Sequence, residues 1–106
     1  MSEVFDAIVS REKQVFMPMV RRWPVALERG FGSRVWDVEG REFIDLTAGW
    51  GVTAIGHCHP ELAEAISDQA RTLMQTTNIV YTKPQLDLAE RLARLAPRGI
   101  HQSFFT

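Results

Sequence analysis

The sequence predicts an α/β fold, and three observations carry that prediction. Residues Val25–Leu46 alternate apolar and polar side chains between glycine-containing turns, which is typical of antiparallel strands. Two later segments repeat apolar residues at helical spacing. The segment Ile100–Thr106 follows them and is predicted to be a strand. With a helix at the beginning, the expected order is helix, antiparallel strands, two helices and strand.

The first predicted element is a helix that runs from Ser2 toward Val15. A serine at this position can accept a hydrogen bond from an amide of the first turn. Pro18 and Pro24 end any helix, because each lacks an amide donor and restricts the residue before it. One side of the helix would carry Val4, Phe5, Ile8 and Val9.

A small antiparallel meander is predicted next, beginning with a strand from Val25 and a turn at Gly30–Ser33. Val35–Val38 forms its second strand, Glu39–Gly40 a hairpin turn, and Arg41–Leu46 the returning strand. Gly49-Trp50-Gly51 then interrupts the alternation, and glycines at such a place usually mean that backbone passes close to another group.

Two helices and a strand complete the prediction. Pro60 fits the first turn of a helix. Thr82 and Gln85 have the spacing of a capping box and open a third helix, which Pro97 stops. The strand Ile100–Thr106 would present an unpaired apolar edge, which predicts instability or self-association of this chain alone. The stripes expected to face a core are Leu62, Ile66, Ala70 and Leu73, then Leu88, Leu92 and Leu95.

Composition limits the partners. The 106 residues suit one domain, with 45% hydrophobic and 24% charged residues as in a soluble globular protein. A net charge of -1 provides no basic field for nucleic acid or for an anionic membrane. No segment approaches the length of a membrane-spanning helix. The single cysteine, Cys58, excludes an internal disulfide and fits a reducing compartment, so a cytoplasmic location is expected.

His57-Cys58-His59 is the most conspicuous polar cluster, and we expect a structural turn there and no metal. Zinc needs about four ligands, and adjacent ligands on an extended segment point to opposite faces. Cys58 has no identifiable activating base, so it is not predicted to be a nucleophile. Trp50 and Tyr81 are candidates for a pocket: the first lies between two glycines, and the second precedes a helix cap.

Several segments, taken in order, resemble the start of class III pyridoxal-phosphate-dependent aminotransferases, which include ornithine, acetylornithine and 4-aminobutyrate aminotransferases. The similarity covers nearly the whole chain. The segments that carry it are Gly32–Arg41, Phe43–Leu46, Ala54–Pro60, Asn78–Gln85 and Ser103–Thr106.

The resemblance implies the N-terminal segment of a fold type I pyridoxal-phosphate-dependent transferase. Residues 1–53 would form the N-terminal segment and small sheet, and residues 54–106 the start of the large cofactor-binding domain, ending before its phosphate loop. Pyridoxal phosphate is the implied cofactor of the complete protein. Lys13 and Lys83 match neither the place nor the context of the family's Schiff-base lysine, so no catalytic or cofactor-binding residue is assigned in this chain.

The resemblance also implies small-molecule partners, an amine or ω-amino acid donor and a keto acid, and a homodimer. The Gly56–Pro60 turn is most similar to the acetylornithine and 4-aminobutyrate branches, whereas Trp50 departs from their usual aliphatic residue. Two alternatives stay open: an aminomutase or decarboxylating transaminase of the same family, and a non-catalytic fragment that acts as an interaction module. The residues implied to bind substrate are Gly49, Trp50, Gly51, Val52 and Tyr81.

Overall fold

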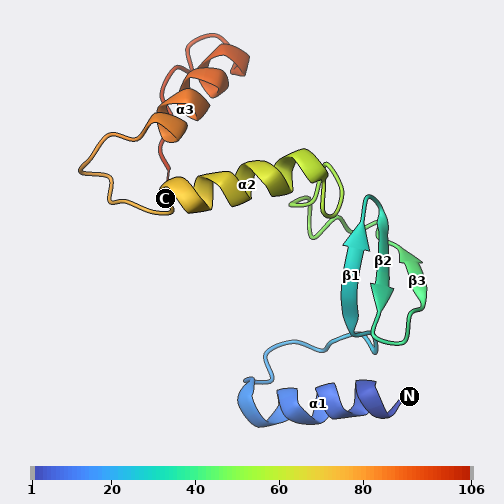
Figure 1. Cartoon of the computed structure of the whole chain (residues 1–106). Coiled ribbons are helices and arrows are strands. Elements are labelled where there is room, and N and C mark those ends of the chain that lie inside the picture. The colour runs from blue at the N-terminus through green and yellow to red at the C-terminus, as the bar shows by residue number, and fades with distance from the viewer. Residues whose placement is uncertain (1, 106) are drawn as a thin grey trace. The chain divides into compact units, whose positions relative to one another are not determined.

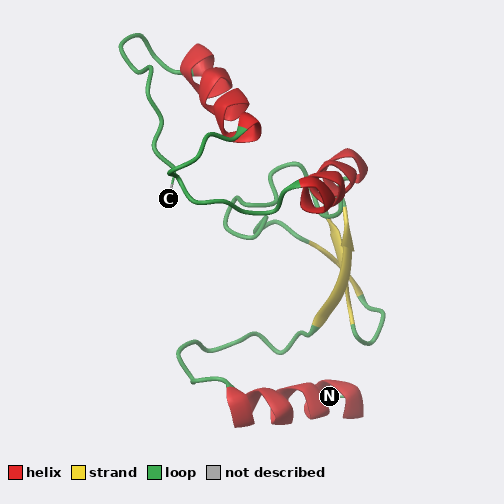
Figure 2. Cartoon of the chain, turned by 60° about the vertical axis from the view of Figure 1, so that its left-hand side comes forward, coloured by secondary structure: helices red, strands yellow, loops and turns green. Residues whose placement is uncertain are grey.

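The structure is a computed structural model that describes residues 2–105. Within these residues the elements are α1 (Glu3–Val15), β1 (Leu27–Phe31), β2 (Arg34–Asp37), β3 (Glu42–Ile44), α2 (Pro60–Thr72) and α3 (Lys83–Leu95) (Figure 1). Irregular segments separate α1 from the sheet, the sheet from α2, and α2 from α3 (Figure 2).

The chain divides into two compact units, one through Arg71 and one from Thr72, and each is described by itself. The predicted boundary after Thr53 stays a prediction. In residues 2–105 no helix has the length and apolar character needed to cross a membrane.

Helix α1 begins as predicted. Ser2 lies at the N-cap, where its Oγ accepts a hydrogen bond from the Phe5 amide at 3.3 Å. Phe5 is the buried residue of the helix, with 6% of its surface exposed. The backbone amide of Ser2 also donates to Glu39 Oε1 at 3.2 Å, which joins the start of α1 to the turn between β2 and β3. Local capping therefore sets where α1 begins.

The predicted antiparallel meander is confirmed, with strand order β1-β2-β3 (Figure 1). The first turn is shorter than predicted. Phe31 pairs with Arg34, so only Gly32 and Ser33 form the loop, and Gly32 has the positive φ of 56° that such a loop requires. An irregular register between Leu27 and Arg29 interrupts the strict alternation expected at the start of the sheet.

The second turn is at Glu39–Gly40, as predicted, and Asp37 closes it. Asp37 is 2% exposed, and its Oδ1 accepts hydrogen bonds from the amides of Glu39 at 3.0 Å and Arg41 at 2.8 Å. Its Oδ2 accepts from Arg41 Nε at 2.7 Å. Burial opposes ionisation, but these bonds, led by the Arg41 side chain, hold the pKa of Asp37 below its usual value. Gly40 supplies the left-handed residue, with φ of 79°.

Helices α2 and α3 form where the sequence predicts them, but two details are wrong. The hydroxyl of Thr82, the N-cap residue of α3, contacts Gln85 Oε1 at 3.5 Å and bonds no backbone amide of the helix, so the capping box is incomplete. The apolar stripes also lie exposed, because neither helix has a buried residue in the part of the chain that the structure describes. Spacing specifies a helix locally, whereas burial requires an opposing surface.

The predicted strand Ile100–Thr106 is also wrong for its described residues, because 100–105 are irregular. A strand is defined by hydrogen bonds to a neighbouring strand, and no strand among the described residues pairs with this segment. Phe104 is largely exposed there. The predicted self-association of the chain through this segment stays a prediction.

Candidate functional site

The loop between the sheet and α2 is closed at its base by a carboxylate and an imidazole. Asp45 follows β3, and His57 lies 12 residues later, just before α2. His57 Nε2 donates to Asp45 Oδ2 at 2.7 Å, and both side chains are largely shielded from solvent. This hydrogen bond holds the two ends of the loop together.

Asp45 also organises the first residues of the loop. Its Oδ1 accepts hydrogen bonds from the Thr47 hydroxyl at 2.7 Å, the Thr47 amide at 2.8 Å and the Ala48 amide at 3.0 Å. The Thr47 hydroxyl and then the His57 ring are the main reasons why the pKa of Asp45 lies well below its usual value. A carboxylate with these partners stays ionised and keeps its four hydrogen bonds.

His57 is fixed to the sheet by its backbone and by close packing. It exchanges both backbone hydrogen bonds with Gly32, at 2.8 and 2.9 Å. A Cβ on Gly30 would lie 2.9 Å from Cβ and Cγ of His57, and a Cβ on Gly56 would lie 2.9 Å from the Gly32 Cα. These two positions accept only glycine without a shift of the neighbouring atoms, so the base of the loop is held against the β1–β2 turn.

The loop contains a left-handed turn. Four consecutive residues have positive φ: Ala48 at 47°, Gly49 at 56°, Trp50 at 63° and Gly51 at 91°. Inside it, the Trp50 amide donates to the Thr47 carbonyl at 2.9 Å and the Gly51 amide to the Ala48 carbonyl at 3.0 Å. For residues with a Cβ this conformation costs about 1–2 kcal/mol each, so the turn needs support from outside itself.

The structure brings four of the predicted site residues onto this turn and its end: Gly49, Trp50, Gly51 and Val52. Trp50 is 100% exposed, which excludes a place in the core of the described residues. Residues held in strained backbone conformations cluster at binding and catalytic sites. The role of Trp50 toward substrate stays a prediction.

Tyr81, the fifth predicted residue, lies in the other compact unit. It is fully exposed at the edge of an open groove of about 490 Å³ between the start of α3 and the segment that follows this helix. Lys83 and Phe104 also line this groove. A partly apolar wall with a phenol and an ammonium group can accommodate a small molecule that carries an acidic group.

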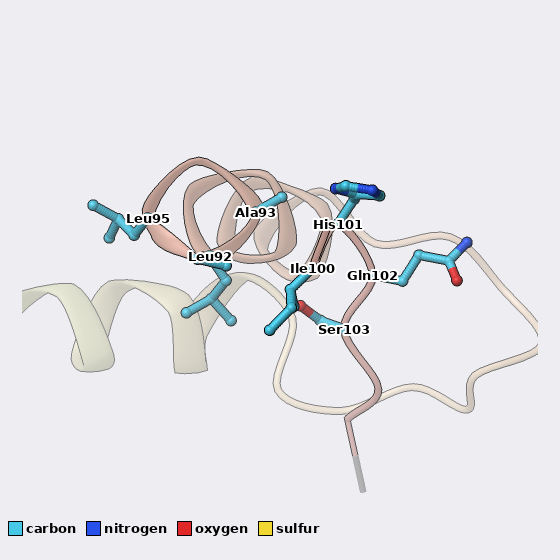
Figure 3. Close-up of a pocket in the computed structure, with 8 residues that line it drawn as sticks. Leu92, Ala93, Leu95, Ile100, His101, Gln102 and Ser103 are labelled. Carbon is cyan, nitrogen blue, oxygen red and sulfur yellow. The ribbon is translucent and has the colours of Figure 1, made fainter. Parts of the chain in front are cut away.

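A second, smaller hollow of about 290 Å³ lies at the other end of α3. Leu92 and Ile100 lie side by side in it, while His101 and Gln102 extend away from them (Figure 3). It brings no charged pair together, and it has no feature that suggests chemistry.

The cluster His57-Cys58-His59 forms a turn, as predicted, with Cys58 in the left-handed region at φ of 52°. The Nε2 atom of His57 is occupied by Asp45. The Nδ1 atom of His59 is buried and has no hydrogen-bond partner among the described residues. Within residues 2–105 no three His, Cys, Asp or Glu side chains are arranged to hold a metal ion.

We therefore expect no stoichiometric zinc in the purified protein, because one His nitrogen and an exposed thiol fall short of the four ligands that zinc prefers. Elemental analysis of wild type and His59→Ala tests this. Zinc at one ion per chain that is lost in His59→Ala would overturn the prediction.

The sequence indicates only indirectly that Asp45 and His57 belong to the candidate site. In the sequence, Asp45 lies within the predicted strand Arg41–Leu46, and His57 is part of a predicted turn. The Asp45-x-Thr47 spacing suits a carboxylate that bonds the amide two residues later, which is a usable local signal. The pairing with His57 has no such signal, because it depends on how the loop between these two residues, 12 positions apart, returns to the sheet.

The chain superposes on parts of solved aminotransferases. A transaminase from the marine bacterium Virgibacillus superposes with a TM-score of 0.84 at 27% identity, covering 94% of this chain and 25% of that one. The N-acetylornithine aminotransferase of Stenotrophomonas maltophilia K279a superposes with a TM-score of 0.69 at 45% identity, covering 81% of this chain and 22% of that one. The predicted fold class is confirmed.

Sequence comparison gives the same answer. Residues 15–106 match the family described as aminotransferase class-III. Over 97 residues the chain is 43% identical to the acetylornithine aminotransferase of Methanocaldococcus jannaschii, which covers 92% of this chain and 24% of that protein. The chain belongs to the class III aminotransferase family. It spans about a quarter of the length of the relatives that it matches.

Proposed function

We propose that this chain is part of a pyridoxal-phosphate-dependent aminotransferase that moves an amino group from an acetylornithine-like amine or ω-amino acid to a keto acid. The observation that carries the proposal is the 43% identity to an acetylornithine aminotransferase across 92% of the chain. The 45% identity to the N-acetylornithine aminotransferase of Stenotrophomonas maltophilia K279a supports the same choice of donor.

The described residues do not themselves fit the cofactor. Lys13 lies in the last turn of α1 and Lys83 at the first residue of α3, both exposed, and neither is enclosed as a Schiff-base lysine must be. Bound pyridoxal phosphate would supply an electron sink for the carbon that loses its proton. We therefore assign to this chain a role in shaping the donor site and no chemical step.

Within this proposal, the substrate-binding residues of the complete protein include Gly49, Trp50, Gly51, Val52 and Tyr81. The exposure of Trp50 on a left-handed turn supports this role for the first four residues. The groove beside Tyr81, with Lys83 at its edge, supports it for Tyr81. The complete protein would act as a homodimer on small-molecule amines and keto acids in the cytoplasm.

Transamination by the full-length protein tests the proposal. The purified protein is supplied with pyridoxal phosphate, a panel of keto acids, and N-acetylornithine, ornithine or 4-aminobutyrate as donor. We expect the highest kcat/KM with N-acetylornithine. Highest activity with ornithine or 4-aminobutyrate would move the proposal to another branch. Decarboxylation or intramolecular amino transfer would favour the alternative reactions, and no turnover of any donor would favour the non-catalytic module.

For the 106-residue chain alone we expect neither specific cofactor binding nor transamination, because its exposed lysines can form only weak imines with an aldehyde. Titration with pyridoxal phosphate, followed by imine absorbance before and after denaturation, measures this. The expected signal saturates poorly and is unchanged by denaturation. Tight one-to-one binding that is lost on unfolding, together with turnover, would mean that the active site lies within these residues.

A further inference from the structure

The left-handed turn Ala48–Gly51 requires support that its own hydrogen bonds do not provide. Two of its residues, Ala48 and Trp50, carry a Cβ at positive φ. At about 1–2 kcal/mol each, this strain sums to about 2–4 kcal/mol and cancels most of the net gain of about 1 kcal/mol from each of the three hydrogen bonds of the turn. A third bond, from the Thr53 amide to the Ala48 carbonyl at 3.0 Å, closes the turn but leaves its entry free to unwind.

Asp45 fixes that entry. Three hydrogen bonds to one oxygen hold Thr47 and Ala48, and Ala48 is the first left-handed residue. Hydrogen bonds to an ionised carboxylate are stronger than those between neutral groups, and here they converge on two successive residues. The backbone entering the turn is thus held at the point where its strain begins.

His57 connects Asp45 to the sheet. Its ring donates a hydrogen bond to the second oxygen of Asp45. Its backbone amide and carbonyl both form hydrogen bonds with Gly32 in the β1–β2 turn. Because Gly30 leaves room for the ring, the imidazole lies directly against β1. Asp45 and His57 therefore fix the position of Trp50 relative to the antiparallel sheet.

We propose that Asp45 and His57 are positioning residues of the donor site: together they hold the turn Ala48–Gly51 in the conformation that presents Trp50 to the amine donor. The inference rests on the proposed function of the Trp50 segment. Neither residue touches substrate in this role. They set where the indole lies, and a displacement of about 1 Å at a substrate contact can cost roughly a hundredfold in rate.

The test uses the full-length protein labelled with 5-fluorotryptophan, with the Trp50 resonance assigned by Trp50→Phe. Asp45→Asn keeps the shape of the side chain and removes its charge, and His57→Gln removes the partner while sparing the bonds to Thr47 and Ala48. Both should shift or broaden the Trp50 resonance. Both should lower kcat/KM for the amine donor between about ten- and hundredfold, mainly through KM.

Asp37→Asn is the matched control. Asp37 organises a turn in the same manner, through two backbone amides and one cationic side chain, but it lies at the β2–β3 turn. It should lower the unfolding midpoint and leave both the Trp50 resonance and the donor KM unchanged. The double variant Asp45→Asn/His57→Gln should be no worse than the more damaging single variant, because the two residues act as one unit.

The outcomes separate the inference from the function on which it rests. An unmoved Trp50 resonance in both Asp45→Asn and His57→Gln would overturn the inference that these residues hold the turn Ala48–Gly51. A moved resonance with unchanged donor kcat/KM would overturn their positioning role. If the wild type transaminates no donor while the resonance moves as expected, the proposed donor site is wrong, but Asp45 and His57 still hold the turn.

Discussion

Gly56→Ala is expected to destabilise the protein strongly, because this position combines a left-handed backbone with a close approach to another segment. Gly56 has φ of 88°, and a Cβ on it would lie 2.9 Å from the Gly32 Cα and 3.1 Å from the Gly32 carbonyl carbon and oxygen. The left-handed backbone costs about 1–2 kcal/mol and the overpacking about 1–3 kcal/mol more, so we expect a loss of about 2–5 kcal/mol. The urea unfolding midpoint of the full-length variant measures it.

Gly40→Ala separates the two causes. Gly40 has a similar φ of 79°, but a Cβ there would have nothing within 4 Å. It should lose only the backbone contribution of about 1–2 kcal/mol. Equal losses in Gly40→Ala and Gly56→Ala would mean that the approach of Gly56 to Gly32 contributes nothing to stability.

Trp50→Ala in the full-length protein should change the ratio of kcat/KM between two amine donors of different size by about tenfold or more. Removing an indole enlarges the donor site by far more than one methylene group, and a single methylene already discriminates by roughly tenfold or more. Stability should change by less than about 0.5 kcal/mol, because the ring is fully exposed and alanine accepts the same backbone strain.

Two further substitutions make the Trp50 result specific. Trp50→Leu supplies an aliphatic side chain of the kind implied for the acetylornithine branch, and it should shift the donor ratio in the same direction as Trp50→Ala but by less. Trp23→Ala removes another exposed tryptophan, in the segment between α1 and β1, and should leave the donor ratio unchanged. A change in stability without any change in donor ratio would mean that Trp50 has a purely structural role.

The parts of the fold that the sequence predicted correctly depend on neighbouring residues. Ser2 starts α1 through its own hydroxyl, Pro60 starts α2, and Gly40 supplies the positive φ of the second hairpin turn. The errors arose where one residue depended on a distant one or on exact side-chain geometry. The capping pair Thr82 and Gln85 had the right spacing but not the backbone hydrogen bond.

The candidate site shows the same division. The two glycines around Trp50 predict an irregular backbone. In the structure this irregularity is a run of four consecutive residues with positive φ. The support of this turn was not predictable, because the hydrogen bond between Asp45 and His57 joins residues 12 apart. The place of Tyr81 before a helix cap makes it a pocket candidate from sequence, whereas the groove beside it depends on the segment after α3.

By itself, the sequence determined the helices, the meander with its second turn, and membership of the class III aminotransferase family, because caps, periodicity and ordered motifs are properties of the chain read in order. Only the tertiary structure decided that Gly56 approaches Gly32 and that His57 anchors Asp45. It also decided that Ile100 begins no strand. These features require two separate segments to meet, and loop closure and partner surfaces determine that meeting, whereas local preference does not.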